Sequence, residues 1–411
     1  MTIAKPFIFS IALALIVGAI WYLEAIKPSQ SPPAQSVEIK PNLQTEEIAE
    51  ATLIFVSSTQ AKANQKKTLS KTTAPARPRL DRGAVIQAKM KQYPLAKEIV
   101  QPAGFVNINS INIQDLIGKK VVLVDFWTYS CINCQRTLPY LNGWYDKYKD
   151  QGLIIVGVHT PEFKFEQEYD NVSRAVKKFA LKYPVVLDNN YGTWRAYGNR
   201  YWPRKYLIDI DGFIVYDHIG EGAYAQTEEK IQAALAERAS ALNLKPMGKT
   251  AMLLPLNPPV VNFQEINSPE VYFGAARNEY LANGQKGVIG KQDLIQAKTS
   301  RLNQLYLVGT WDIQDEFARN QTLSAKIIFR YSAKDVYFVG SAEAPVRIKV
   351  RRDGQLLGQV AGEDIDKKTS TVLVQEDRLY KLINDAGGAG EHTLEMIIES
   401  SGLKAFTFTF G

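Results

Sequence analysis

A buried strand followed closely by a Cys-x-x-Cys motif is the feature that most constrains how this chain can fold. Residues 121–126 (VVLVDF) form an almost continuous apolar run, which is typical of a strand covered on both faces. Trp127 ends this run, Cys131 and Cys134 follow, and the residues after them show the apolar spacing of a helix. The sequence therefore predicts a central strand that carries two thiols to the first turn of a helix.

Cys131 and Cys134 are the only cysteines among the 411 residues. A structural zinc site normally has four ligands, and the three histidines (His159, His218 and His392) are scattered along the chain. We therefore expect neither a metal nor a cofactor, and we interpret the motif as a redox-active dithiol.

The two thiols have different expected roles. Cys131 lies where the helix begins, so unpaired backbone N–H groups and the helix dipole favour its thiolate and make it the attacking nucleophile. Cys134 lies one turn further in and can attack a mixed disulfide on Cys131, which releases the reduced substrate. This arrangement predicts thiol–disulfide exchange.

Two further residues are candidates for the same site. Asp125 is set in the apolar strand, so burial would raise its pKa and let it accept the proton of Cys134. The alternative is a carboxylate at the strand end that faces water. Pro203 precedes a predicted strand, and a cis peptide there would turn the backbone edge toward an extended substrate segment.

The composition limits the class of protein. A chain of this length suggests two or three domains. The net charge of +7 comes from 49 basic and 42 acidic residues, and no nucleic-acid-binding motif concentrates it. We expect no nucleic-acid partner.

The N-terminal region contains an uncharged stretch at residues 7–23 (FIFSIALALIVGAIWYL). Its length reaches the lower limit for a transmembrane helix, and Trp21 and Tyr22 suit a membrane–water boundary. A cleaved signal peptide is the alternative, with a possible cleavage site near Ala19. Both interpretations place the remaining chain outside the cytoplasm, where disulfide chemistry has substrates. We expect a single-pass anchor in the inner membrane, with the domains in the periplasm or extracytoplasmic space.

Changes of pattern divide the rest of the chain. We assign residues 1–26 to the anchor or signal segment and 27–85 to a flexible basic linker, which acts as a tether or is attracted to anionic lipids. Residues 86–244 alternate strands and helices and include a hairpin at Asp211-Gly212, which predicts an α/β sheet covered by helices. A proline-interrupted linker covers 245–261. Residues 262–411 change to a period of two, which predicts a β-sandwich or jelly roll.

Several segments carry a resemblance to a known family. VDFWTYSCINC (124–134), GVHTPEF (157–163), DNNYGTWRAYGN (188–199) and YWPRKYLID (201–209) resemble the thioredoxin-like domain of DipZ and TlpA-type redoxins. SPEVYFG (268–274), AKDVYFVG (333–340) and FTFTFG (406–411) resemble the C-terminal domain of DipZ-like proteins, which is similar to a carbohydrate-binding jelly roll.

The resemblance implies a redox disulfide between Cys131 and Cys134, a buried acid at Asp125 and a cis proline at Pro203. It also implies a role like that of the redoxins of cytochrome c biogenesis. DipZ proteins carry a multi-helix CcdA-like membrane domain that passes electrons outward, whereas this chain has one apolar segment. We therefore expect a separate membrane electron donor of the CcdA or DsbD type, alongside exported cysteine-containing proteins as substrates.

Other functions remain open at this point. One alternative is the oxidase direction, in which the chain is a disulfide donor, and another is a glycan- or envelope-binding protein on a redoxin scaffold. Trp311, Tyr337 and Phe338 are then either sugar-stacking residues or core residues. A thiol peroxidase would use an isolated cysteine, whereas here both thiols belong to one ring-closing motif.

Overall fold

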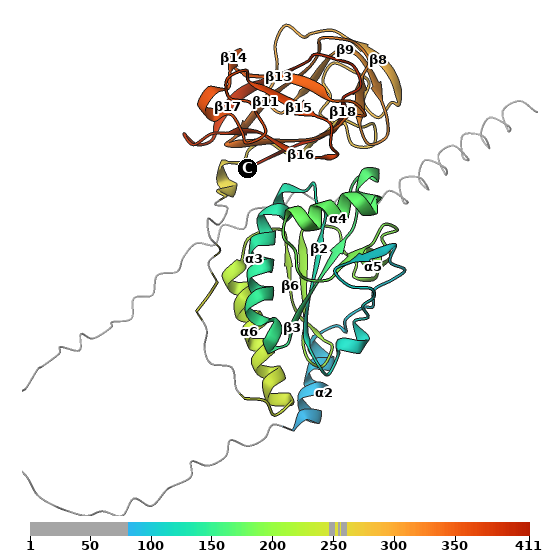
Figure 1. Cartoon of the computed structure of the whole chain (residues 1–411), viewed down its shortest axis with the longest axis vertical. Coiled ribbons are helices and arrows are strands. Elements are labelled where there is room, and N and C mark those ends of the chain that lie inside the picture. The colour runs from blue at the N-terminus through green and yellow to red at the C-terminus, as the bar shows by residue number, and fades with distance from the viewer. Residues whose placement is uncertain (1–80, 246–250, 254, 256–260) are drawn as a thin grey trace, which may run out of the picture. The chain divides into compact units, whose positions relative to one another are not determined.

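Two sheets organise the part of the chain that the computed structural model describes, which is residues 81–245, 251–253, 255 and 261–411 (Figure 1). Both sheets belong to one compact unit. The predicted membrane segment and all but the end of the basic linker lie outside the described residues. Within the described ranges, no helix is both long and apolar enough to cross a membrane.

The α/β domain (residues 81–245) contains a six-stranded sheet in the order β1-β4-β3-β2-β5-β6. Strands β2, β3 and β4 run parallel, and β1, β5 and β6 are antiparallel to their neighbours. Its elements are α2 (Arg82–Gln92), β1 (Gly104–Val106), η1 (Gln114–Leu116), β2 (Val121–Trp127), α3 (Ile132–Tyr148), η2 (Lys149–Gln151), β3 (Leu153–His159), η3 (Lys164–Gln167), α4 (Tyr169–Lys178), β4 (Val185–Leu187), α5 (Gly192–Ala196), β5 (Arg204–Ile208), β6 (Ile214–Ile219) and α6 (Tyr224–Ala241).

The central strand β2 is buried along its whole length, as its apolar run predicts. Successive side chains alternate between the two faces of a strand. Val121, Leu123 and Trp127 pack with α3, α4 and α6 on one face, whereas Val124 and Phe126 pack on the other face. Position 125 therefore belongs to the face that carries α3 and Cys134.

The strands and most helices of this domain lie close to where the sequence predicts them. The apolar run at residues 121–126 is strand β2, which extends one residue further, to Trp127. The predicted hairpin turns at Gly212, which has a φ of +88°. Helix α2, in contrast, begins at Arg82, inside the segment assigned to the linker. Helix α2 has no buried residue, so it carries no apolar stripe that would predict a packed helix.

The β domain (residues 261–411) contains a twelve-stranded antiparallel sheet, with a main order of β14-β13-β17-β11-β9-β10-β18-β12-β16. Its elements are η4 (Phe263–Glu265), β7 (Val271–Tyr272), β8 (Gly290–Leu294), β9 (Leu305–Ile313), β10 (Ala318–Asn320), β11 (Ala325–Ala333), β12 (Asp335–Ser341), β13 (Val346–Arg352), β14 (Gln355–Leu356), η5 (Gly358–Val360), β15 (Thr371–Val374), β16 (Arg378–Asn384), β17 (Gly390–Ile398) and β18 (Lys404–Phe410).

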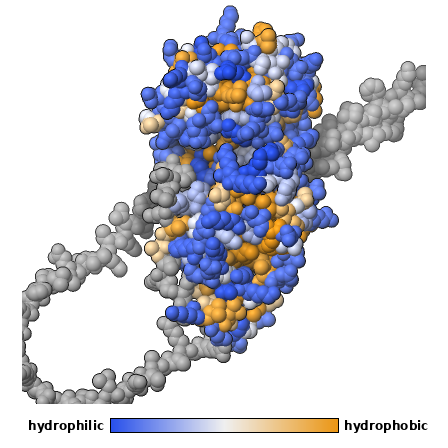
Figure 2. Space-filling view, in the orientation of Figure 1, coloured by the Kyte–Doolittle hydropathy of each residue, from blue (hydrophilic) through white to orange (hydrophobic). Residues whose placement is uncertain are grey.

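The sheet of the β domain curls so that distant strands face each other. Strands β11 and β18 are three places apart in the sheet, yet the rings of Phe329 and Phe408 lie 5.8 Å apart and those of Phe329 and Phe410 lie 5.6 Å apart. The curl encloses one apolar core. Hydrophilic side chains cover most of this domain's face in Figure 2, as expected for strands with one buried face.

The aromatic residues considered for sugar stacking are all buried. Trp311 and Phe338 have no exposed surface and lie in the core of the β domain. Tyr337 is 6% exposed and packs where the two domains meet. These three side chains are therefore core residues, which is the second of the two interpretations given above.

A bulge in β18 joins the β domain to the α/β domain. The pattern of residues 406–410 (FTFTF) predicts three phenylalanines on one face. The pairing of β12 with β18 skips Phe406, because Val339 pairs with Thr407 and Gly340 pairs with Ala405. Phe406 instead packs against Phe163 and Phe165 of the α/β domain, with ring centroids 5.1 and 4.8 Å apart.

Candidate active site

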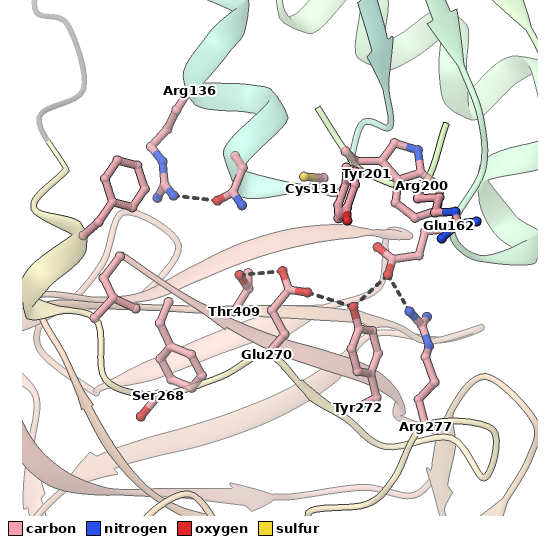
Figure 3. A pocket seen from close by; sticks show the side chains of 15 residues that line it. Cys131, Arg136, Glu162, Arg200, Tyr201, Ser268, Glu270, Tyr272, Arg277 and Thr409 are labelled. Carbon is pink, nitrogen blue, oxygen red and sulfur yellow. Dashed lines mark hydrogen bonds and ion pairs between the residues drawn. The ribbon is translucent and has the colours of Figure 1, made fainter. Parts of the chain in front are cut away.

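Cys131 is the N-cap residue of α3, between the end of β2 and the first turn of the helix. Its sulfur accepts a hydrogen bond from the backbone N–H of Cys134 at 3.4 Å. The side chain is partly exposed and lines a cleft (Figure 3). This is the position predicted for the nucleophile, where the helix end favours a negative charge on sulfur.

Cys134 is buried beneath Cys131, with 1% of its surface exposed. Burial raises the pKa of the Cys134 thiol well above its usual range, and the neighbouring Cys131 and the Asp125 charge raise it further. Cys134 therefore keeps its proton until a base removes it. Both thiols are free, and the accessible one lies in front of the buried one.

Asp125 lies on the face of β2 that carries Cys134, and its side chain is 1% exposed. The oxygen Oδ1 has no hydrogen-bond partner among the described residues. Burial raises the pKa of Asp125 to about 7, and the charge of Lys205 opposes this rise. The residue is therefore a buried acid that titrates near neutral pH, and the water-facing alternative is excluded.

Lys205 pairs with Asp125 across β2 and β5 and is fully buried. Its ammonium group donates a hydrogen bond to the backbone carbonyl of Gly220 at 3.2 Å. Burial lowers the pKa of Lys205, and the charges of Asp125 and Cys134 act in the opposite direction. A buried lysine with one hydrogen bond is unusual, because each ammonium group has three donors.

A glycine makes room for this buried acid. Gly157 of β3 pairs with Asp125 on the side opposite to Lys205. A Cβ atom at this position would lie 3.0 Å from the indole nitrogen of Trp127 and 3.1 Å from the ring of Tyr183. The Tyr183 hydroxyl is buried and has no hydrogen-bond partner in the described part of the chain, and burial raises its pKa, with the charges of Asp125 and Cys134 adding to the rise. These rings close the space around the acid and exclude water from it.

Pro203 follows Trp202 through a cis peptide bond and ends the loop before β5. The indole N–H of Trp202 donates to the backbone carbonyl of Thr160 at 3.0 Å, and Trp202 lines the same cleft as Cys131. The structure thus brings Cys131, Cys134, Asp125 and the Trp202-Pro203 bond together at one end of the sheet.

A second buried acid, Glu166, holds the loop that precedes Cys131. Its Oε1 accepts from the hydroxyl of Ser130 at 2.6 Å, and its Oε2 accepts from the backbone N–H groups of Glu162 and Phe163 at 2.5 and 3.0 Å. Burial raises the pKa of Glu166 to about 7, and the charge of Glu162 adds to this effect. Glu166 therefore ties the loop after β3 to the residue next to the nucleophile.

His159 supports the same loop from inside the protein. Its Nε2 accepts from the backbone N–H of Tyr129 at 3.3 Å, and burial lowers its pKa to about 3. The ring is therefore neutral, with its proton on Nδ1. His159 therefore supports the loop from inside the protein. Among the described residues, neither thiol forms a hydrogen bond with it.

The cleft in front of Cys131 has a volume of about 500 Å³ and is lined by both domains. Cys131 and Tyr201 lie on the side of the α/β domain, and Tyr272 and Thr409 lie on the side of the β domain (Figure 3). We call this space the redox cleft. Glu162 of the α/β domain joins the two sides of the cleft. Its Oε1 accepts hydrogen bonds from the Tyr272 hydroxyl and from Arg277 Nη1 of the β domain, both at 2.8 Å.

The acidic cluster formed by Asp209, Asp211 and Glu237 is the arrangement among the described residues that most resembles a cation site. The ammonium group of Lys89 lies among its three carboxylates, at 2.5 to 3.0 Å from their oxygens. The cluster is therefore an ion-pair network that attaches α2 to the sheet.

Lys205, Glu166 and the β-domain residues of the redox cleft were missed by the sequence analysis. Lys205 had a usable signal, since it directly precedes the apolar residues Tyr206, Leu207 and Ile208, two residues after Pro203. Glu166 lies in a short polar segment that resembles any surface turn. The β-domain residues become part of the site only through the packing of the two domains, which no local pattern records.

Comparison with known families agrees with this division into two domains. Residues 94–235 match the family model described as Redoxin, and residues 268–411 match the model described as Thioredoxin like C-terminal domain. The two matched ranges contain, respectively, the strands of the first sheet and the strands of the second.

Three relatives illustrate the similarity. The chain is 34% identical over 328 residues to Protein DipZ of Mycobacterium tuberculosis, a match that covers 79% of this chain and 44% of DipZ. It is 29% identical over 148 residues to the thiol-disulfide oxidoreductase YkuV of Bacillus subtilis, covering 36% of this chain and 99% of YkuV. It is 35% identical over 125 residues to the thiol-disulfide oxidoreductase ResA of Bacillus thuringiensis, covering 30% of this chain and 66% of ResA. The chain thus spans less than half the length of DipZ.

Proposed function

Since this chain belongs to the DipZ-related redoxins, which are thioredoxin-like thiol–disulfide oxidoreductases, we propose that it reduces or exchanges disulfides in exported cysteine-containing proteins. The observation that carries this proposal is the asymmetry of the two thiols. Cys131 is accessible at a helix N-terminus, whereas Cys134 is buried directly behind it and holds its proton. This is the geometry that a two-step exchange needs.

In the first step, the Cys131 thiolate attacks one sulfur of the substrate disulfide. A Cys131–substrate bond forms, the substrate S–S bond breaks, and the other substrate sulfur leaves with the electron pair. In the second step, Asp125 takes the proton of Cys134, and the resulting thiolate attacks the sulfur of Cys131. The ring disulfide forms, and the substrate leaves with its second thiol reduced.

Pro203 and Lys205 have supporting roles in this proposal. Arg200, Tyr201 and Trp202 line the redox cleft, and we assign to the backbone that follows them at Pro203 the edge that pairs with an extended segment. Lys205 lies opposite Asp125 and keeps the pKa of that acid from rising further, so that Asp125 can accept a proton near neutral pH.

Disulfide reduction of insulin with dithiothreitol as the reductant tests the proposal. We expect Cys131→Ser to lose at least 99% of the activity that exceeds the uncatalysed rate, because no nucleophile remains (about 3 kcal/mol in the barrier). Cys134→Ser should accumulate the mixed disulfide between Cys131 and insulin. Equal turnover by Cys131→Ser and the parent chain would refute the enzymatic function.

We further propose that residues 7–23 anchor the chain in the inner membrane, with both domains in the periplasm or extracytoplasmic space. The uncharged apolar run and its aromatic end support this location. An alkaline carbonate wash of membranes, combined with protease treatment of spheroplasts, tests it. Release into the soluble fraction, or protection of the domains from the protease, would contradict it.

The reducing direction requires an electron donor, for which we propose a membrane protein of the CcdA or DsbD type. The sequence supports this requirement, because it contains no second Cys-x-x-Cys motif that passes electrons within the chain. Cys134→Ser in cells should trap the donor, and alkylation should find the parent dithiol reduced. A largely oxidised dithiol that traps a quinone-linked oxidase would reverse the direction.

For the domain boundaries, we propose residues 86–244 and 262–411 with a linker at 245–261. The two separate sheets and the two matched family ranges support this division. A fragment of residues 262–411 should give a β-rich circular-dichroism spectrum and unfold cooperatively. An unfolded fragment would show that the β domain depends on the α/β domain.

A further inference from the structure

The β domain forms the second wall of the redox cleft. The β domain supplies Tyr272 and Thr409 to the lining, opposite Cys131 (Figure 3), and Phe263 of the same domain also lines the cleft. Substrates of Cys131 must therefore enter between two domains. This inference rests on the function proposed above and adds the class of substrate.

Buried packing keeps this wall in place. Ile132, the residue after the nucleophile, is 6% exposed and packs in one apolar cluster with Tyr337, Val339 and Leu379 of the β domain. Phe163 and Phe406 belong to the same cluster. Because buried apolar contacts hold both domains next to Cys131, the cleft is formed before any substrate binds.

The dimensions of the cleft restrict the shape of the substrate. About 500 Å³ is the size of a pocket for a small molecule or a few residues, whereas two folded proteins usually bury about 800 Å² on each partner. A flat folded surface cannot enter a cleft of this size, which Cys131 and the β-domain residues line together. An extended, flexible segment can reach it.

The charges of the cleft point to an acidic substrate. The lining contains three arginines, of which Arg136 is paired with Glu221, and Arg277 is paired with Glu162. The guanidinium group of Arg200 makes no hydrogen bond or ion pair with any described residue. Glu270 is held by the hydroxyls of Tyr272 and Thr409. Among the arginines of the described lining, Arg200 is therefore the one without a carboxylate partner.

We propose that the redox cleft is a composite substrate site, in which the β domain forms one wall and Arg200 selects extended disulfide-bearing segments with a carboxylate next to the cysteine. The carboxylate pairs with Arg200 while the substrate sulfur approaches Cys131. Exposed aromatic side chains at the lining, Tyr201 and Phe263, contact the segment on either side.

Single-turnover reactions of the pre-reduced full chain test the charge selection. The probes are three short peptides with Asp, Asn or Lys next to one cysteine, each joined by a disulfide to thionitrobenzoate. Attack by Cys131 on the peptide sulfur breaks the S–S bond and releases the coloured thionitrobenzoate anion, and Cys134 then releases the peptide thiol. Glutathione disulfide, a small acidic disulfide, is a fourth probe that separates a low-molecular-weight source from a peptide source.

We expect the Asp peptide to react about fivefold faster than the Asn peptide at low salt, and we expect high salt to remove the difference. Arg200→Gln should abolish the preference and Arg200→Lys should retain most of it. Arg195→Gln is the matched control, since Arg195 is exposed in the same domain but does not line the cleft. Equal rates for all peptides would refute the selection but leave the proposed function standing, whereas no reaction with any probe would refute both.

A charge placed on the opposite wall tests the contribution of the β domain. Phe263 is 56% exposed, so Phe263→Glu should fold normally and should reverse the preference toward the Lys peptide. Leu323→Glu, at a site 71% exposed on the same domain and outside the cleft, is the control and should change nothing. In the peptide adduct of Cys134→Ser, hydrogen exchange should slow in residues 263–272 and 405–410. Protection confined to the α/β domain would show that the β domain is no part of the site.

Discussion

At the scale of single residues, the most distinctive feature of the candidate active site is a buried acid, Asp125. Asp125 lies between Gly157 and Lys205 in neighbouring strands, and its Oδ1 has no partner among the described residues. Such a group is a poor contributor to stability, because its ionised form lacks solvation. The same burial raises its pKa to about 7, which is the strength that the proposed role as base for the Cys134 thiol requires near neutral pH.

The first prediction is that Asp125→Asn stabilises the fold and slows resolution of the mixed disulfide. The pKa is raised in the folded state to about 7, so between about pH 4 and pH 7 only the folded chain keeps this proton. The free energy of unfolding of the parent therefore falls as pH rises through this window, by up to about 4 kcal/mol. Asn removes this fall, and urea denaturation should show the variant gaining stability over the parent as pH rises. Parallel curves for the two proteins would contradict the buried acid.

The second prediction concerns Lys205. The positive charge of Lys205 counteracts the effect of burial on the pKa of Asp125. Lys205→Met removes that charge and should raise the pKa of Asp125 further. The pH midpoint for resolution should then move upward, and the rate at neutral pH should fall several-fold, because tenfold less ionised Asp125 accompanies each pKa unit. The decay of a preformed mixed disulfide, followed across pH, measures this. Lys177→Met, at an exposed position of α4, is the control and should leave the profile unchanged.

At the scale of elements, two loops form the site and one side chain joins them. The loop between β2 and α3 carries Cys131, and the loop after β3 carries Glu162. Glu166 accepts hydrogen bonds from both loops, through Ser130 and through the backbone of Glu162 and Phe163. The position of the nucleophile therefore depends on a residue 35 positions away in the sequence.

The third prediction follows from this tie. Glu166→Ala leaves the Ser130 hydroxyl and two backbone N–H groups without an acceptor, which should cost about 3 kcal/mol of unfolding free energy and lower the rate of Cys131 alkylation. Glu166→Gln can keep its oxygen on the two N–H groups and donate to Ser130, so its cost should be about 1 kcal/mol. Denaturation and iodoacetamide kinetics measure both effects. Equal behaviour of the Ala and Gln variants would show that the hydrogen bonds do not hold the loop.

The sequence predicts the elements better than it predicts their contacts. Strand β2, helix α3, both thiols and Asp125 follow from local patterns, because burial and helix spacing are properties of neighbouring residues. Phe406 shows the limit of prediction from local patterns. Its alternation with Phe408 and Phe410 predicts one shared face, but a bulge turns it to the other face, toward Phe163. A bulge depends on the partner strand, so no pattern within residues 406–410 predicts it.

At the scale of the whole molecule, a shared proton contributes to the junction of the two domains. The Tyr272 hydroxyl lies 2.8 Å from Glu162 and 2.9 Å from Glu270, and one hydroxyl proton cannot serve two carboxylates. Burial raises the pKa of Glu270, and the charge of Glu162 adds to the rise, whereas Tyr272, Thr409 and Arg277 oppose it. Glu270 therefore binds a proton more readily than an ordinary glutamate, and a proton on Glu270 relieves the competition for the Tyr272 hydroxyl.

The fourth prediction is that the junction loosens as pH rises. Because the folded pKa of Glu270 is raised, its contribution to stability is complete below the ordinary glutamate pKa and is lost as pH rises through the folded value. Glu270→Gln keeps the hydrogen bonds without titrating, so it should remove this part of the pH dependence. Hydrogen exchange at residues 271–272 and 405–407, compared between the two proteins across pH, measures it. The same increase in exchange in both proteins would exclude Glu270 as the cause.

The place of β18 in its sheet also decides the order in which the molecule can mature. Strand β18 pairs with β7, β10 and β12. These three strands are synthesised earlier and cannot complete their pairing until β18 is present. The α/β domain needs nothing from β18 to complete its own sheet. During synthesis from the N-terminus, the α/β domain can therefore fold while the β domain is still open. For that interval a nascent chain presents Cys131 and Arg200 without the second wall, so the cleft is open on the side that the β domain later covers.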